Sequence, residues 1–251
     1  MVLLHGLTAS RRYVVMGSRA LERSGHRVIS YDARGHGRSG PAAQPEDYGY
    51  EALAQDLIAV MDHRGVERAV LAGASMGAHT LLRAALTAPQ RVAGVVVITP
   101  AYAGPQSLAP ARLERWDQLA VGLRERGVEG FLEAYGEPQV SSEELARTVR
   151  TVIRQRLALH QHPLAVADAL QAVPRSQPFA EISALGAISA PAVIVGSSDG
   201  ADPEHPLAVA QAYARAIPGA SLVSDRPGAS PVAWQGSQLS RIIAELVSLT
   251  R

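Results

Sequence analysis

A serine framed by two glycines follows directly behind an aliphatic run in the first third of this chain. The turn reads Gly73-Ala74-Ser75-Met76-Gly77, the run before it is Arg68–Ala72, and the helical stretch after it, Met76–Ala88, ends at Pro89. A G-x-S-x-G turn between a strand and a helix is typical of a nucleophile elbow, where any side chain at either glycine would meet a neighbouring strand or helix. The turn predicts that Ser75 Oγ projects above a sheet and that the Met76 amide lies at a helix N-terminus, where unpaired N–H groups favour an anion.

Short aliphatic runs alternate with helical stretches along most of the chain. Runs without polar alternation indicate strands covered on both faces, so we expect an α/β fold with a mostly parallel, doubly wound sheet. The expected strands are Val2–His5, Arg27–Asp32, Ala69–Gly73, Val92–Thr99, Ala192–Gly196 and Ser221–Asp225. The expected helices are Ser10–Ser24, Tyr50–His63, Met76–Ala88, Pro206–Ala216 and Trp234–Leu249.

The pattern changes between residues 101 and 185, where helical periodicity dominates and no strand candidate occurs. A helical insertion within a resumed α/β pattern predicts a lid over one edge of the sheet. We therefore expect a core made of residues 1–100 and 186–251, with residues 101–185 as the helical lid. Because Met1–Leu4 already has the character of a buried strand, we expect the chain to begin inside a domain. A truncated gene and a true start without earlier strands both remain open.

Composition narrows the possible partners and cofactors. The formal net charge is +1, which gives no indication of a nucleic-acid partner. The chain lacks cysteine, which excludes a thiol nucleophile and a thiolate metal site. No apolar stretch reaches the length of a membrane span, and no signal peptide is recognisable, so we expect a cytoplasmic protein. We find no metal-binding or dinucleotide motif and expect no cofactor. Composition leaves the oligomeric state open.

Ligands of an open parallel sheet bind beyond the carboxyl ends of its strands, so the loops there are the candidate site. These loops read His5-Gly6-Leu7-Thr8, Asp32-Ala33-Arg34-Gly35-His36-Gly37-Arg38-Ser39, the Ser75 turn, and Gly196-Ser197-Ser198-Asp199-Gly200-Ala201-Asp202-Pro203. Four such segments in this order resemble the α/β-hydrolase superfamily, and the resemblance covers nearly the whole chain. Two features depart from it: the first two strands of that family are absent, and so is its catalytic histidine.

The resemblance implies a role for several residues. Ser75 would be the nucleophile, and the amides of Leu7 and Met76 would form an oxyanion hole, where each donor contributes roughly 3–4 kcal/mol to transition-state binding. Asp199 occupies the position of the family's acid, which orients the base. Asp202 is an alternative acid, although its place before Pro203 favours a helix-capping role.

The base is the missing element. In relatives it lies in the loop before the last helix, but residues 225–235 contain no histidine, and none occurs after His205. A serine hydroxyl is a poor nucleophile without an adjacent base. Three histidines remain as substitutes: His205 on the acid loop, His5 in the oxyanion turn and His79 one helical turn beyond Ser75. We expect His36 to be structural and the remaining four, His26, His63, His160 and His162, to lie at the surface.

Two hypotheses follow. The first is a serine hydrolase that cleaves a small ester, thioester or related acyl substrate through an acyl-Ser75 intermediate. The second is a degenerate hydrolase that binds a small ligand or a partner protein without turnover, because the loop histidine is absent. Serine at the elbow argues against the related chemistries that use an aspartate there. The arginines Arg147, Arg150 and Arg154 share a helix face, which we interpret as solvated rather than as a substrate site.

Overall fold

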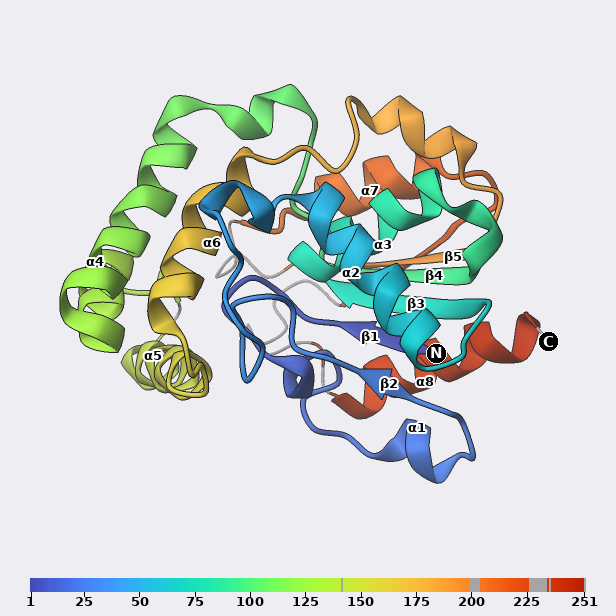
Figure 1. Cartoon of the computed structure of the whole chain (residues 1–251), viewed down its shortest axis with the longest axis horizontal. Coiled ribbons are helices and arrows are strands. Elements are labelled where there is room, and N and C mark those ends of the chain that lie inside the picture. The colour runs from blue at the N-terminus through green and yellow to red at the C-terminus, as the bar shows by residue number, and fades with distance from the viewer. Residues whose placement is uncertain (141, 199–203, 226–233, 235, 251) are drawn as a thin grey trace.

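A parallel six-stranded sheet forms the centre of the protein in the computed structural model, which describes residues 1–140, 142–198, 204–225, 234 and 236–250. Its strands are β1 (Val2–Leu4), β2 (Ile29–Ser30), β3 (Ala69–Ala74), β4 (Val92–Ile98), β5 (Ala192–Gly196) and β6 (Ser221–Ser224). The strand order is β2-β1-β3-β4-β5-β6, and every neighbouring pair is parallel (Figure 1). The predicted α/β class and parallel sheet are therefore confirmed.

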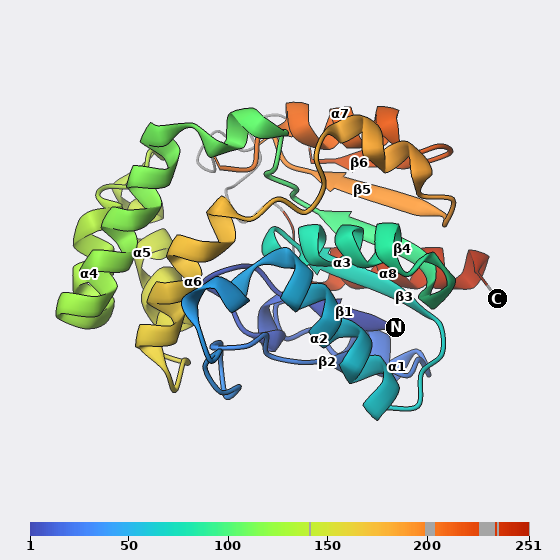
Figure 2. The ribbon, with the colours of Figure 1, turned by 45° about the horizontal axis from the view of Figure 1, so that its top comes forward.

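Helices cover both faces of this sheet (Figure 2). One face packs against α2 (Tyr50–His63), α3 (Met76–Thr87) and α7 (Leu207–Ala216), and the other against α1 (Ala20–Arg23) and α8 (Gly236–Leu249). Successive residues of each strand alternate between the two cores: Leu71 belongs to the first and Val70 to the second. This double burial is the reason that the strands read as continuous aliphatic runs.

The helix expected over Ser10–Ser24 does not form as one element. The structure has a short 3-10 turn at Arg11–Tyr13 and the four-residue α1. Between them the backbone of Met16 has φ of 46° and that of Gly17 has φ of 73°, outside the helical region. Helix α8 lies so close to this segment that a Cβ at Gly236 would overlap the Val15 carbonyl. Close tertiary packing therefore replaces the local helical preference here.

Residues between β4 and β5 form α4 (Pro110–Tyr135), α5 (Glu143–Leu157) and α6 (Pro163–Arg175), which gather beyond the carboxyl ends of the strands (Figure 1). Helix α4 bends back at Arg126 and Gly127, whose backbone angles are not helical. These helices share an apolar cluster with Leu7 and Met76 of the core. The insertion therefore packs directly over the end of the sheet that carries Ser75.

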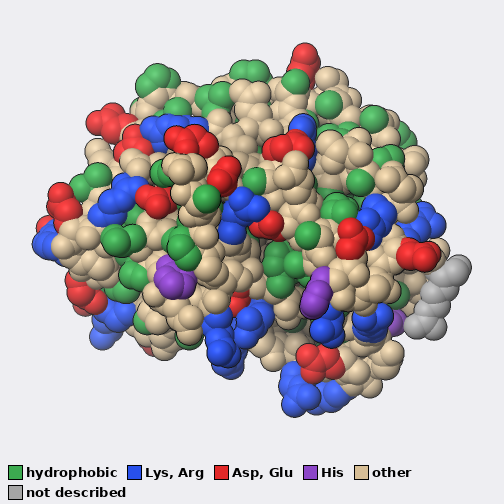
Figure 3. All heavy atoms as spheres, in the orientation of Figure 1, with side chains coloured by type: hydrophobic (Ala, Val, Ile, Leu, Met, Phe, Trp, Pro, Cys, Tyr) green, Lys and Arg blue, Asp and Glu red, His purple; other side chains and the backbone are tan. Residues whose placement is uncertain are grey.

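The visible surface mixes charges of both signs. Arginine and acidic side chains are interspersed over the face drawn in Figure 3, in keeping with the net charge of +1. Among the described residues, no helix has both the length and the apolar character needed to cross a membrane.

Candidate active site

The turn at Ser75 has the geometry that the sequence predicts. Ser75 has φ of 51° and ψ of −111° at the junction of β3 and α3, a conformation that costs a non-glycine residue on the order of 1–3 kcal/mol. A Cβ at Gly73 would overlap the backbone of Gly77, and a Cβ at Gly77 would overlap the backbone of Leu4. Both glycines are therefore required by close backbone approaches, and together they hold Ser75 above the end of the sheet.

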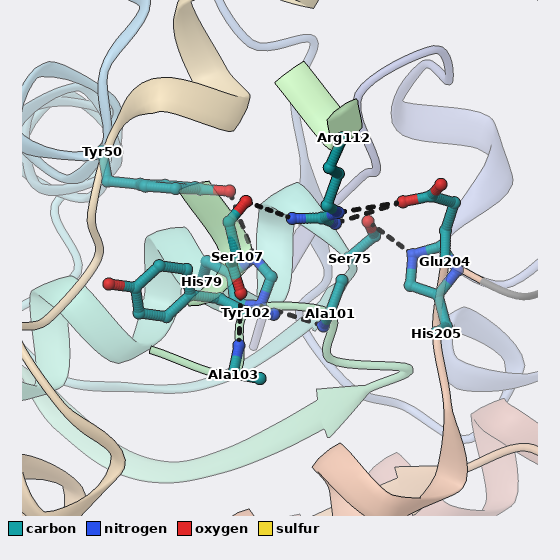
Figure 4. Close-up of polar contacts among 10 residues, drawn as sticks. All are labelled: Tyr50, Ser75, His79, Ala101, Tyr102, Ala103, Ser107, Arg112, Glu204 and His205. Atoms are coloured by element: carbon teal, nitrogen blue, oxygen red, sulfur yellow. Dashed lines mark hydrogen bonds and ion pairs between the residues drawn. The ribbon is translucent and has the colours of Figure 1, made fainter. Parts of the chain in front are cut away.

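His205 is the histidine that the structure brings to this serine. Its Nε2 lies 2.8 Å from Ser75 Oγ, across 130 residues of sequence (Figure 4). His205 precedes Pro206, the N-cap residue of α7, so the helix fixes the chain immediately after it. The predicted substitute base on the β5–α7 segment therefore lies where a proton could pass from Ser75 Oγ to an imidazole.

The other two substitutes are engaged elsewhere. His5 is buried; its Nε2 accepts the Ala33 amide at 2.9 Å, and its Nδ1 lies 2.8 Å from the Gly6 carbonyl. His79 Nε2 accepts the amides of Ala101 and Tyr102 at 3.2 and 3.1 Å, and its Nδ1 lies 3.1 Å from Tyr50 Oη. Both ring nitrogens of each histidine already lie within hydrogen-bond distance of neighbouring groups other than Ser75. The structure therefore does not support His5 or His79 as the base.

The buried position of His79 predicts a loss of stability in acid. Desolvation, followed by the charges of His205 and Arg112, lowers the pKa of His79 to about 3. Between about pH 3 and pH 6.5, this imidazole is protonated in the unfolded chain but stays neutral in the folded protein. The free energy of unfolding therefore falls as the pH falls through this range. For His79 alone the loss from pH 6.5 to pH 4 is roughly 3 kcal/mol.

Urea unfolding at several pH values measures this loss. We expect His79→Gln to flatten the dependence of unfolding free energy on pH between 6.5 and 4, with the exposed His162→Gln as the matched control. An unchanged slope in His79→Gln would contradict a buried neutral imidazole. His160, whose pKa burial lowers to about 4, adds a smaller effect of the same sign.

Two amides are available as anion donors beside Ser75. Leu7 and Met76 both line the pocket, and among the described residues neither amide N–H donates to another group. The carbonyl of Leu7 accepts a hydrogen bond from His36 Nε2, which fixes the orientation of the turn. Met76 is the first residue of α3, so its N–H is one of the unpaired groups at a helix start.

The pocket over Ser75 is small and largely apolar. Its volume is about 50 Å³, which is small for a ligand pocket. The residues that line it come from the core and from the insertion: Leu7, Tyr50, Ser75, Met76, His79, Ala101, Tyr102, Arg112, Trp116, Val173, Pro174, Ser176, Glu204 and His205. Trp116 of the insertion thus forms a wall of the site.

Asp199 and Asp202, the expected acids, lie outside the described residues. A carboxylate without a predicted role, Asp225, lies directly after β6. It accepts the hydroxyl of Ser197 at 2.9 Å and both the amide and the hydroxyl of Ser198, at 2.6 and 2.9 Å. Burial raises the pKa of Asp225, but these hydrogen bonds outweigh it and hold the pKa below its usual value. Asp225 therefore links Ser197 and Ser198, the first residues after β5, to the end of β6.

The structure also brings to the site residues that no sequence pattern singles out. Arg112 and Glu204 line the pocket and pair with each other, whereas Arg154 on α5 pairs with Glu129 instead. His160, expected at the surface, is buried, and its Nδ1 accepts the Gly37 amide at 2.8 Å. The described residues contain no group of three or more acidic or histidine side chains that could hold a metal ion.

Comparison with known proteins agrees with this architecture. Residues 1–231 match the family model described as alpha/beta hydrolase fold. The chain is similar to the structure of a thermophilic esterase from Thermogutta terrifontis (26% identity, 99% of this chain and 89% of that one, TM-score 0.79). It is also similar to the enol-lactonase from Burkholderia xenovorans (25% identity, 99% and 88%, TM-score 0.72).

Similarity to several curated relatives covers less than half of this chain. A putative carbamate hydrolase of Variovorax paradoxus is 38% identical over 97 residues, 39% of this chain and 36% of that protein. The chain thus spans about a third of the length of the first curated relatives that it matches.

Proposed function

Because this chain belongs to the α/β-hydrolase fold family, we propose that it is a serine hydrolase that cleaves a small ester or related acyl compound through an acyl-Ser75 intermediate. The observation that carries the proposal is the 2.8 Å approach of His205 Nε2 to Ser75 Oγ. In relatives the base comes from the loop before the last helix, whereas this chain would supply it from the segment between β5 and α7. The catalytic pair would thus be retained with a relocated imidazole.

The reaction would proceed in two halves. As Ser75 Oγ attacks the carbonyl carbon, His205 Nε2 takes the hydroxyl proton, and the carbonyl oxygen becomes an oxyanion that the amides of Leu7 and Met76 stabilise. His205 then gives that proton to the leaving alcohol as the carbon–oxygen bond breaks. In the second half a water molecule attacks the acyl-Ser75 carbonyl with His205 as the base, which releases the acid and restores Ser75. The sequence of steps calls for no cofactor.

The walls of the pocket favour a small acyl group. Leu7, Met76, Val173 and Pro174 present apolar surface, and Tyr50 and His79 are neutral groups that hydrogen-bond to each other. A cavity of about 50 Å³ suits an acetyl- or propionyl-sized chain rather than a fatty acyl chain. The names of similar proteins, an esterase, an enol-lactonase and a putative carbamate hydrolase, all describe cleavage at an acyl carbon.

The helical insertion would act as the lid of this site. Residues 101–185 supply Arg112, Trp116 and Val173 to the pocket, while residues 1–100 and 186–251 supply Ser75, Met76 and His205. The division proposed here therefore places nucleophile and base in the core and most of the apolar roof in the lid.

A fluorophosphonate probe tests the proposal directly. We expect the folded protein to be labelled at Ser75, identified by peptide mass spectrometry, and to hydrolyse p-nitrophenyl acetate faster than p-nitrophenyl octanoate. Ser75→Ala is expected to abolish labelling. The matched control is Ser176→Ala, which removes another serine of the same pocket and is expected to keep it. A well-folded protein that resists the probe would instead support a binding protein without turnover.

A further inference from the structure

The segment that carries His205 is held from the opposite side by the helical insertion. Glu204, the residue before His205, pairs with Arg112 in the first turn of α4. The guanidinium donates Nε and Nη2 to Glu204 Oε2, at 3.3 and 3.2 Å. The two side chains are only 26% and 33% exposed, so the pair is partly shielded from water. It lies beside the Ser75–His205 contact in Figure 4.

Arg112 is itself fixed to the first residues of the insertion. Its Nη1 donates to the Ser107 carbonyl at 3.2 Å. Ser107 is buried, and its hydroxyl accepts the Ala103 amide at 2.8 Å on the chain that leaves β4. All three nitrogens of the Arg112 guanidinium therefore donate to a partner. A continuous set of contacts runs from the segment that follows β4 through Arg112 and Glu204 to the residue before His205.

We propose that Arg112 is a positioning residue, which holds Glu204 and, through it, the neighbouring His205 in reach of Ser75. The proposal rests on the serine-hydrolase function and adds a dependence of the base on the insertion. Consecutive residues share a peptide plane, so a restraint on the Glu204 side chain limits the backbone angles open to His205. Displacement of a catalytic group by about 1 Å can cost a factor of about 100 in rate, so even a weak restraint matters here.

A different use of Arg112 would be to bind a carboxylate of the substrate. The geometry favours positioning because the guanidinium is already neutralised by Glu204, and an anionic substrate would have to displace that carboxylate. The two roles predict opposite behaviour for Glu204. Removal of its charge disturbs His205 under the positioning role, but frees Arg112 for the substrate under the other.

A double-mutant cycle on Arg112 and Glu204 distinguishes the positioning role from substrate binding. We expect Arg112→Met and Glu204→Gln each to lower kcat for p-nitrophenyl acetate by about 10- to 100-fold with KM changed less than about threefold, since the loss is one of geometry. The double variant is expected to lose no more than either single variant, because both changes break one contact. Arg154→Met and Glu129→Gln, which break an ion pair between α5 and α4 away from the pocket, are the matched controls and are expected to stay near wild type.

Three outcomes would overturn the proposal. Losses that multiply in the double variant would mean that the two residues act separately. A rise in KM confined to the anionic ester p-nitrophenyl hemisuccinate in Arg112→Met, with a fall in Glu204→Gln, would assign Arg112 to the substrate. Wild-type kcat in both single variants would show that the pair does not position the base.

A spectroscopic measurement keeps the proposal testable if Ser75 proves unreactive. Histidine side-chain nitrogen–proton NMR correlations identify His205 by the signals lost in His205→Gln. We expect these signals to shift alike in Arg112→Met, Glu204→Gln and the double variant, and to stay in place in the Arg154 and Glu129 controls. Unshifted His205 signals would overturn the positioning role itself, whereas absence of fluorophosphonate labelling in the wild-type protein would overturn only the hydrolase function.

Discussion

Replacing His205 by glutamine is expected to lower kcat/KM for p-nitrophenyl acetate by a factor of about 10⁴, while the protein stays folded. Removal of one member of a serine–histidine pair costs about 10⁴ to 10⁶ in rate, because an unactivated hydroxyl attacks slowly. The amides of Leu7 and Met76 would remain and account for the residual rate. The partly buried position of His205 beside Ser75 makes it the one described imidazole within hydrogen-bond distance of Oγ.

The control for this variant is His63→Gln, an exposed histidine at the end of α2. We expect it to match wild type. A second arm uses His205→Ala, in which imidazole added to the buffer is expected to restore part of the rate by occupying the vacated space. Hydrolysis within a few-fold of wild type in His205→Gln would show that another group activates Ser75, and the relocated base would be wrong.

The sequence predicts the core of this fold well because its signals are local. Strands β3 and β4 fall within one residue of their expected ends, since strands buried on both faces admit few polar residues. The Ser75 turn is equally predictable, because a five-residue motif marks it: Gly73 is required by a backbone contact within the same strand–helix unit, and Gly77 by the backbone of the neighbouring strand β1. The prediction of a helix over Ser10–Ser24 is wrong for the opposite reason. Contact with α8, more than 200 residues later in the chain, decides the conformation of this segment.

The base illustrates the limit of sequence reasoning more sharply. His5, His79 and His205 all lie on segments near the carboxyl edge of the sheet, and nothing in their neighbours separates them. Only the contacts made by the ring nitrogens separate them, and for His205 that contact spans 130 residues. The role of Arg112 is even harder to predict, because an arginine in the first turn of a polar helix is common in sequences. Only the structure places Glu204 opposite it.

Substitution of Gly77 by alanine is expected to destabilise the protein by at least about 3 kcal/mol, at the severe end for an added methyl group. The new Cβ would overlap the backbone carbonyl of Leu4 in β1 and crowd that of His5. Backbone atoms of a central strand cannot rotate away, so α3 would have to shift from the sheet. Because domains are stable by only about 5–15 kcal/mol, we expect a large fall in the urea midpoint and in soluble yield.

Gly40→Ala is the matched control, since a Cβ there meets no atom within 4 Å and its backbone does not have positive φ. Its stability is expected to stay within about 0.5 kcal/mol of wild type. Wild-type stability in Gly77→Ala would contradict the close approach of α3 to β1.

The comparison with Ser75→Gly is the more informative one. Glycine accepts φ of 51° without strain, so that variant is expected to gain about 1 kcal/mol in unfolding free energy while losing fluorophosphonate labelling. Opposite effects on stability at two neighbouring positions would separate the architectural role of the turn from its chemical one: Gly77 permits the close packing of α3 on β1, and Ser75 retains a strained backbone in order to present its hydroxyl to His205.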